Sequence, residues 1–315
     1  MKILIGYDGS KSAEATLDDL QLAGLPSDCE ALVLSVNETW LPSPSFNGNG
    51  SGVKLEADTN ELLQKQLRKI KRTVGEAEIF ARHAQTRLRA TFPAWKIDTA
   101  ATSGSPGAEI LDKADTFNAD LIVVGSRGRF SSGSFVLGSI SSKVVSQAKC
   151  SVRVARGKIG VARLPARIII GFDGSAGAKL AVETTAGRKW RENTEIRLIA
   201  ATSQIEPATL ERFVPLTPHK LDVEGKAESG WLEKLAESSL RILRDANITA
   251  TLHITAGNPK QVLIEEAEKW HASSIFIGAN SSGGRMEQFL LGSTSEAMTT
   301  RASCSVEVVR LKTGQ

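Results

Sequence analysis

Short apolar runs, many rich in β-branched residues, alternate along this chain with longer amphipathic stretches. In the first half we predict strands at residues 3–6, 31–36, 96–101, 121–125 and 152–155, and helices at residues 13–23, 55–90, 106–117 and 139–148. Most of the predicted strands are apolar at consecutive positions, which is typical of strands buried on both faces of a parallel sheet. The alternation of strand and helix therefore predicts an α/β fold with helices on both faces of the sheet.

The second half of the chain repeats the first in the same order. Residues 3–10 (ILIGYDGS) recur as residues 168–175 (IIIGFDGS), and residues 150–154 (CSVRV) recur as residues 304–308 (CSVEV). The first copy has a longer early loop at residues 42–52, whose Pro, Gly, Ser and Asn suit neither a helix nor a strand. An internal repeat of this length indicates two similar domains in tandem.

The domain boundaries follow from the repeat. We predict a first domain at residues 1–156 and a second at residues 166–311. The linker, at about residues 156–167, is interrupted by two glycines and a proline. A chain of 315 residues is long enough for two domains that each bury a core.

Composition excludes several classes of protein. Hydrophobic residues make up 41% and charged residues 23% of the chain, as in soluble globular proteins. A net charge of +4 without a run of basic residues does not favour nucleic-acid binding. No apolar stretch approaches the roughly 18 residues of a membrane span, and the opening residues do not form a signal peptide. Because the three cysteines form no Cys-x-x-Cys pair, we expect a reducing compartment and a cytoplasmic protein.

Candidate binding residues cluster where predicted strands end. Ligands of open parallel α/β sheets bind beyond the carboxyl ends of the strands. In the first copy this edge receives the turn Asp8-Gly9-Ser10 and the end of the second strand at Val36. Asp-Gly-Ser is also a helix N-cap signal, so a purely structural role for this turn stays open.

The loop after the fourth strand is the most specific feature of the sequence. Gly125 and Gly128 are separated by two residues, and nine residues separate Gly128 from Gly138, which Ser139 follows. Glycine allows the backbone to approach a ligand closely, and free N–H groups in such a loop can bind an anion. A helix that begins at Ser139 would add the positive end of its dipole.

Charged and polar residues of the same loop strengthen this interpretation. Ser126 lies inside the glycine loop, and Arg127 and Arg129 add positive charge to it, although a solvated role for the two arginines is an open alternative. The arrangement suits a diphosphate or triphosphate.

These residues resemble the universal stress protein family, and the repeat resembles its tandem-domain members. ATP-binding members carry Gly-x2-Gly-x9-Gly-(Ser/Thr), which Gly125, Gly128, Gly138 and Ser139 match. The resemblance covers nearly the whole chain twice. It implies a five-stranded parallel sheet in each domain, of the Rossmann-like, adenine nucleotide alpha hydrolase-like type, and pairing of the two domains through their final strands.

The resemblance also implies a ligand. It places ATP, or ADP or AMP, in the first cleft, with Asp8 beside the nucleotide and the backbone at Val36 against the adenine. An accompanying Mg²⁺ is an open alternative, and two chains could also associate as a homodimer.

The second copy departs from the family pattern. Gly278 and the pair Gly292-Ser293 match, but Ser281 replaces the second glycine and ten residues follow it instead of nine. We therefore expect the second domain to be mainly structural. Asp173 keeps the strand-end aspartate, for which a capping role is the simpler interpretation.

Three functions remain open from the sequence. The first is a stress-response regulator that binds ATP. The second is a slow ATPase or phosphotransferase, for which the sequence offers no convincing general base. The third is a scaffold that binds no nucleotide. The tryptophans Trp190, Trp231 and Trp270 lie on predicted helical stretches, where we expect them to pack.

Overall fold

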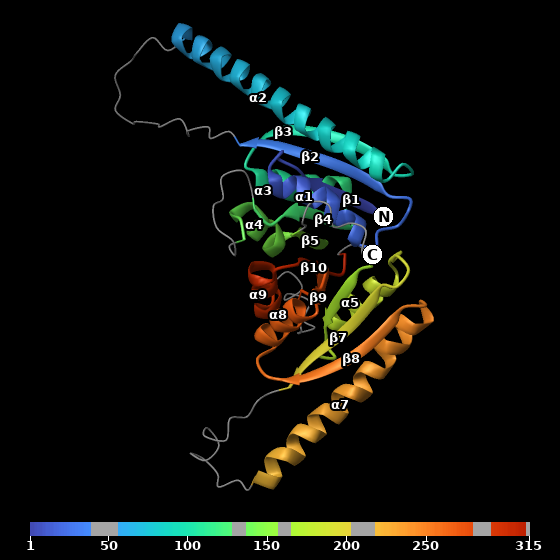
Figure 1. The fold of residues 1–315 in the computed structure, drawn as a ribbon. Helices are drawn as coiled ribbons and strands as arrows, with labels where there is room; N and C mark the ends of the chain where they lie inside the picture. Colours follow the sequence, from blue (N-terminus) through green and yellow to red (C-terminus); the bar gives the residue numbers. More distant parts are fainter. Residues whose placement is uncertain (39–55, 128–136, 157–164, 203–217, 280–290, 313–315) are drawn as a thin grey trace, which may run out of the picture.

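The computed structural model describes residues 1–38, 56–127, 137–156, 165–202, 218–279 and 291–312. Its ten strands form one continuous sheet in the order β3-β2-β1-β4-β5-β10-β9-β6-β7-β8 (Figure 1). The order is nearly symmetric about the boundary between β5 and β10. Each half of the sheet is parallel, and the two halves meet as an antiparallel pair of final strands.

The first half of the chain supplies five strands and the helices that connect them. The strands are β1 (Lys2–Gly6), β2 (Glu30–Glu38), β3 (Lys96–Gly104), β4 (Leu121–Gly125) and β5 (Ser151–Ala155). The helices are α1 (Lys11–Asp19), the short 3-10 helix η1 (Leu20–Leu22), α2 (Glu56–Thr91), α3 (Pro106–Phe117) and α4 (Ser139–Gln147).

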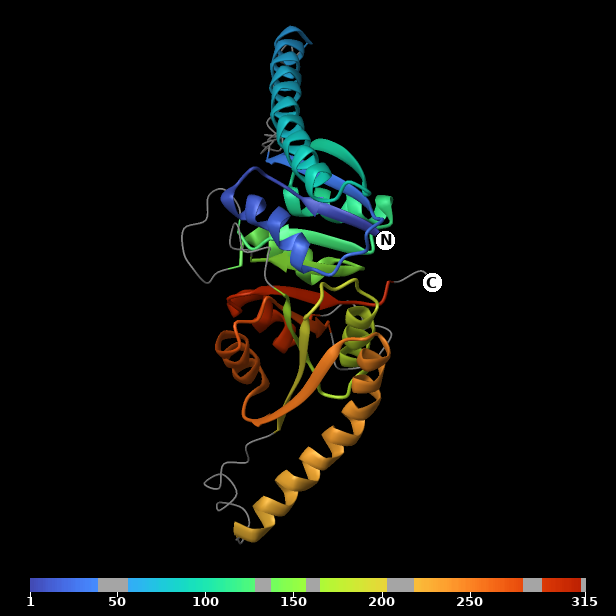
Figure 2. The same cartoon turned by 45° about the vertical axis from the view of Figure 1, so that its right-hand side comes forward.

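The second half repeats this arrangement. Its strands are β6 (Arg167–Gly171), β7 (Glu195–Thr202), β8 (Thr249–Ala256), β9 (Ser274–Gly278) and β10 (Ser305–Val309). Its helices are α5 (Ala176–Ala186), α7 (Pro218–Asp245), α8 (Pro259–Lys269) and α9 (Ser293–Arg301). The long helices α2 and α7 lie at opposite ends of the molecule (Figures 1 and 2).

Several predicted elements have different bounds in the structure. Strands β2 and β3 continue through polar residues to Glu38 and Gly104, because these two strands stay paired along their whole length. The predicted helix at residues 13–23 begins earlier, at Lys11, and changes to a 3-10 turn after Asp19. The apolar pattern located the centres of these elements, whereas backbone pairing and capping set their ends. Residues 42–52 of the predicted early loop lie outside the described residues.

The sheet separates a shared core from two smaller cores. On one face, which we call the shared face, α3, α4, α8 and α9 cover a single apolar cluster that runs through both domains. On the opposite face, α1 and α2 cover one cluster in the first domain, and α5 and α7 cover another in the second. The continuous core on the shared face joins the two domains through apolar packing.

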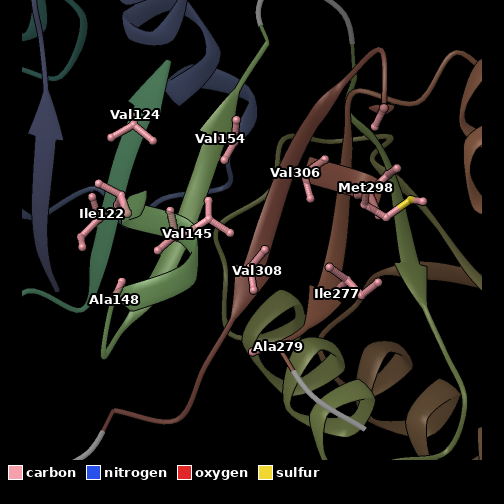
Figure 3. Packing of buried hydrophobic residues seen from close by; sticks show 14 of the residues in the cluster. Ile122, Val124, Val145, Ala148, Val154, Ile277, Ala279, Met298, Val306 and Val308 are labelled. Atoms are coloured by element: carbon pink, nitrogen blue, oxygen red, sulfur yellow. The ribbon is translucent and has the colours of Figure 1, made fainter. Parts of the chain in front are cut away.

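At the domain boundary the final strands place alternate residues on opposite faces. Val154 of β5 and Val306 and Val308 of β10 belong to the core on the shared face, where Val145 of α4 and Met298 of α9 also pack (Figure 3). The residues between these valines, Arg153 and Glu307, face the other way because side chains alternate along a strand. The boundary is therefore apolar on one face and charged on the other.

The three tryptophans have different environments. Trp190 lies in the loop after α5, where it packs edge-on against Phe276. Trp270 is buried at the end of α8. Trp231 lies on α7 with 57% of its surface exposed, so the expectation that it packs was wrong.

Among the described residues, the helices lack the combination of length and apolar character that crossing a membrane requires.

Candidate functional site

A cavity opens in the first domain at the carboxyl ends of β1, β2 and β4. Its volume is about 530 Å³. Within the described part of the chain it is lined by Gly6, Asp8, Ala13, Leu34, Val36, Asn37, Glu38, Pro106, Ile110, Val124, Gly125, Arg127, Gly138, Ser139, Ile140 and Ser141. This is the sheet edge at which a doubly wound fold binds its ligands. The volume lies within the roughly 300–1,000 Å³ of small-molecule sites.

Six of the eleven candidate residues line this cavity together. They are Asp8, Val36, Gly125, Arg127, Gly138 and Ser139. They come from three strand ends and the start of one helix, which are far apart in the sequence. Gly9, Ser10 and Ser126 are not among the lining residues, and Gly128 and Arg129 lie outside the described residues.

The turn after β1 contributes Asp8 to the cavity wall and also caps helix α1. Asp8 accepts a hydrogen bond through Oδ1 from the backbone N–H of Ser10, at 3.0 Å. Ser10 caps α1 by accepting a hydrogen bond from the N–H of Ala13, at 3.1 Å. The N-cap is therefore Ser10 and not Asp8.

Gly9 fits this turn for a steric reason. Its φ is +75°, and a Cβ at this position would lie 2.6 Å from the ring of Phe80. Both facts require glycine for the turn itself. The role of Gly9 in ligand binding stays a prediction, as do those of Ser10 and Ser126.

Helix α4 begins at the cavity, and its N-cap residue makes no side-chain cap bond among the described residues. This residue is Gly138, which has no side chain to accept a hydrogen bond. The loop before α4 is tied to β4 by two hydrogen bonds, from the N–H of Gly138 to the carbonyl of Ser126 at 2.9 Å and from Oγ of Ser141 to the carbonyl of Gly125 at 2.6 Å. The helix start is thus fixed at the strand end, and the N-terminus of a helix is a favourable site for an anion.

Sequence reasoning missed part of the cavity wall. Ile110 of α3 and Leu34 of β2 add apolar surface, and Glu38 adds a carboxylate at the end of β2. Ser141 was detectable, because Ser-x-Ser follows the last glycine in both copies of the repeat. Ile110 and Glu38 had no such signal, since their position depends on how α3 and the end of β2 close around the strand ends.

A cluster of ionisable side chains lies beside the turn, between α1 and α2. Glu14 accepts hydrogen bonds from the Tyr7 hydroxyl and the Arg87 guanidinium, and His83 Nε2 lies 3.2 Å from its Oε1. Burial alone would raise the pKa of Glu14, but the bonds from Tyr7 and Arg87 hold it below its usual value. Burial, and then the bond to Glu14, raise the pKa of Tyr7. The cluster joins α1 to α2 behind the cavity.

The second domain has a smaller cleft at the corresponding place. Its volume is about 220 Å³, and its wall includes Asp173, Ser175, Gly278, Gly292 and Ser293. The turn is the same as in the first domain, with Asp173 Oδ1 accepting from the N–H of Ser175 at 2.9 Å. Residues 280–290, which contain the altered glycine spacing, lie outside the described residues.

Among the described residues, no group of three or more His, Cys, Asp or Glu side chains is placed to hold a metal ion.

Known proteins that are similar to this chain include several universal stress proteins. A universal stress protein of Mycobacterium tuberculosis is 24% identical over 317 residues, which cover 98% of this chain and 96% of the relative. The crystal structure of a universal stress protein from Archaeoglobus fulgidus matches with a TM-score of 0.63 and 20% identity, covering 98% of each chain. A universal stress protein family structure from Arabidopsis thaliana with AMP bound covers 46% of this chain, with 16% identity and a TM-score of 0.33.

The family model covers almost the whole sequence. The model of the universal stress protein family matches residues 1–156 and again residues 166–310. The two matches correspond to the two copies of the repeat and to the two halves of the sheet. The chain therefore belongs to the universal stress protein family and carries two of its domains in tandem.

Proposed function

We propose that this chain is a regulatory protein of the stress response that binds one ATP, or another adenine nucleotide, in the cleft of its first domain. The observation that carries the proposal is the 530 Å³ cavity, where apolar wall, glycine backbone and an uncapped helix start meet at one sheet edge. A nucleotide needs room for its rings, an apolar surface for the base and donors for the phosphates.

The chemistry of the wall suggests how the nucleotide lies. Val36, with Leu34 and Ile110 nearby, offers the base an apolar surface beside the backbone of β2. Gly125, the start of α4 at Ser139 and the side chain of Arg127 offer N–H donors and positive charge to the phosphates. Gly128 and Arg129 remain part of the proposed phosphate loop on the glycine spacing alone.

A divalent cation is part of the proposal. Asp8 and Glu38 bring two carboxylates to its wall, and carboxylate oxygens are the ligands that Mg²⁺ prefers. These two residues would hold a cation that accompanies the phosphates. The cation would neutralise part of the phosphate charge near the carboxylates.

We assign the second domain a mainly structural role. Its cleft of 220 Å³ is smaller than the roughly 300 Å³ at which small-molecule sites begin. Its strand β10 and its share of the common core instead complete the packing of the first domain. This leaves one nucleotide site per chain.

Nucleotide content tests the proposal directly. Purified full-length protein is denatured, and the released nucleotides are quantified by ion-exchange chromatography. Stripped protein is then titrated with ATP, ADP and AMP by calorimetry. We expect about one nucleotide per chain. Two per chain would show that the second cleft binds as well. No nucleotide and no heat on titration would overturn the proposal in favour of the scaffold function.

Hydrolysis separates regulator from enzyme. Phosphate release is measured under excess ATP and Mg²⁺ and compared with the uncatalysed background. We expect release close to background. Release well above background that is lost when the first cleft is blocked would replace the regulator by the slow ATPase.

A further inference from the structure

The middle of the domain boundary contains two opposite charges that are both fully buried. Arg153 and Glu307 are direct Cα partners in the antiparallel pairing of β5 with β10, and each has 0% of its surface exposed. They occupy the same position in the two copies of the repeat. Residues 150–154 and 304–308 read CSVRV and CSVEV, so this position is the one at which the two segments differ.

Each charge is neutralised within its own domain. Arg153 donates to both carboxylate oxygens of Asp19, at the end of α1, at 2.7 and 3.1 Å. Glu307 accepts a hydrogen bond from Arg188, in the loop after α5. Isolated buried charges are very costly, so this internal pairing makes each half of the network tolerable on its own.

Two of the side-chain contacts that Arg153 makes across the boundary depend on the two domains being different, whereas the bond from Ser305 Oγ to Asp19 Oδ1, at 2.6 Å, uses a serine that both copies carry. Arg153 Nη1 lies 3.4 Å from Glu307 Oε2, and Arg153 Nη2 donates to Ser274 Oγ at 2.7 Å. The order of charges across the boundary is therefore acidic, basic, acidic, basic, from Asp19 to Arg188.

Pairing of a domain with a copy of itself would break this order. Two copies of the first domain would place Arg153 opposite Arg153, and two copies of the second would place Glu307 opposite Glu307. The first-domain residue that corresponds to Ser274 is Leu121, since both follow the same register against β1 and β6. Arg153 would then lose its hydroxyl acceptor as well. Directly opposed like charges on neighbouring strands are destabilising, and burial increases the cost.

We propose that Arg153 and Glu307 form a pairing code that makes the final strand of the first domain select the final strand of the second. The partner that this surface fits is an antiparallel strand with a buried acidic residue at its centre. The selected partner is the second domain of this chain, while a second copy of the first domain is rejected. The apolar face of the same boundary cannot select in this way, because it presents valines from both strands, as Figure 3 shows.

Two full-length variants test the selection. In the first variant, Arg153→Glu together with Asp19→Lys places two acidic residues opposite each other within one chain. In the second, Glu307→Arg together with Arg188→Glu places two arginines there. The second substitution in each variant keeps the reversed charge paired within its own domain. When the variants are coexpressed, reciprocal exchange of domains restores opposite charges at both boundaries. We expect native mass spectrometry to find a one-to-one assembly with twice the 33.7 kDa of a single chain, in clear excess over assemblies of two identical chains.

The matched control removes charge without opposing like charges. Full-length Arg153→Met and Glu307→Met variants are coexpressed in the same way, and we expect no preference for the one-to-one assembly. Failure to recover the mixed assembly from the charge variants, or the same distribution of species as in the methionine pair, would overturn the proposal. The readout holds even if each charge variant fails to fold alone, because recovery on coexpression is what is measured.

A double-mutant cycle provides a second measurement in the single chain. Thermal unfolding is followed for Arg153→Met, for Glu307→Met and for the double variant. If the charges act as a pair, each single variant lowers the unfolding midpoint, and the double variant loses less than the sum of the two shifts. Additive shifts would contradict the coupling on which the pairing code depends.

Discussion

The two clefts of this molecule share a framework and differ in the room they leave. Each opens at the carboxyl ends of parallel strands, beside an Asp-Gly-Ser turn and before a helix that follows Gly-Ser. The first encloses about 530 Å³ and the second about 220 Å³. The two turns are alike, whereas the glycine spacing differs in stretches outside the described residues, so the described walls are what can be compared.

One wall position differs in what packs behind it. A Cβ on Gly278 would lie 2.7 Å from Cα of Gly177, so the backbone of α5 packs directly against the end of β9. At the corresponding place in the first domain, the nearest atom to a Cβ on Gly125 is Oγ of Ser12, at 2.8 Å. The helix backbone therefore comes closer to the strand end in the second domain than in the first, where the nearest backbone atom, the carbonyl carbon of Ser12, would lie 3.4 Å from that Cβ.

The helix starts around the clefts differ as well. In the second domain, Asn258 caps α8 by accepting a hydrogen bond from the N–H of Lys260, at 3.0 Å. In the first domain, Ser105 occupies the N-cap of α3 without making a side-chain cap bond in the described part of the chain. The starts of α4 and α9 are alike, since their N-caps Gly138 and Gly292 make no side-chain cap bond among the described residues. The difference in capping is therefore confined to α3 and α8.

The largest expected effect comes from placing a negative charge where we propose phosphate to bind. Ser139→Glu should lower ATP affinity by about 100-fold or more, since like charges brought together cost several kcal/mol. The fold should tolerate the change, because an acidic residue at a helix start is favourable. Calorimetric titration measures the effect.

The same substitution in the second domain is the control for this prediction. Ser293 begins α9 as Ser139 begins α4. Ser293→Glu should leave ATP affinity unchanged. Equal losses in both variants would show that the binding site had been assigned to the wrong cleft.

A steric block should have a smaller effect. Val36→Trp fills the apolar side of the first cavity and should weaken nucleotide binding by about tenfold or more, which corresponds to about 1.4 kcal/mol. Ala201 occupies the matching position in β7, so Ala201→Trp serves as the control and should not change the affinity. A Val36→Trp chain that binds ATP as tightly as the original would contradict the proposed place of the base.

Replacing the turn glycine by alanine should lower stability by a similar amount in both domains. Gly9 and Gly174 both have φ +75°, and a Cβ would lie 2.6 Å from Phe80 in the first case and 2.4 Å from Leu235 in the second. Gly9→Ala and Gly174→Ala should each lower the free energy of unfolding by about 1–2 kcal/mol, because a left-handed backbone disfavours alanine. Urea denaturation measures both. A large loss at Gly9 alone would indicate that its turn does more than shape the backbone.

The smallest expected effect is a pH dependence specific to the first domain. The folded-state pKa of Glu14 is held below its ordinary value of 4.5, so its contribution is present above that pH and is lost as pH falls through the folded pKa. The unfolding midpoint should therefore decline below about pH 4.5 less steeply in Glu14→Gln than in the original chain.

Lys179 provides the matched control for this pH effect. It occupies the corresponding position of α5, three residues after the start of that helix. Lys179→Gln should leave the decline of the unfolding midpoint at acid pH as it is in the original chain. If Glu14→Gln and the original chain show the same decline, the cluster around Tyr7 adds no stability.

Much of the fold was predictable from local pattern. The strand at residues 121–125 and the helix at residues 106–117 have the predicted bounds, because a continuous apolar run and a proline at the helix start are strong local signals. Bounds set by long-range pairing were less accurate, as the polar ends of β2 and β3 show. Trp231 was misplaced because a hydrophobic side chain on a helix does not reveal whether another element covers it.

The candidate site was predictable to a similar extent. Strand ends and glycine spacing led to Asp8, Val36, Gly125 and Gly138, which the fold brings to one cavity. Ile110 was not found, since a buried residue of α3 resembles any other core residue in sequence. The structure gives the turn residue Gly9 a backbone reason for being glycine, and its role in ligand binding stays a prediction, because a glycine required by the backbone resembles one required by a ligand.

The sequence by itself determined the repeat, the α/β class and the sheet edge at which a ligand would bind, because apolar periodicity and glycine positions are local properties of the chain. Only the tertiary structure decided the volume of each cleft and the partner of each buried charge. Cavity volume depends on how strand ends and helices from separate parts of the chain come together around it. The pairing of Arg153 with Glu307 depends on two strands that are 154 residues apart in the sequence. Such distances close only when both domains have folded against one another.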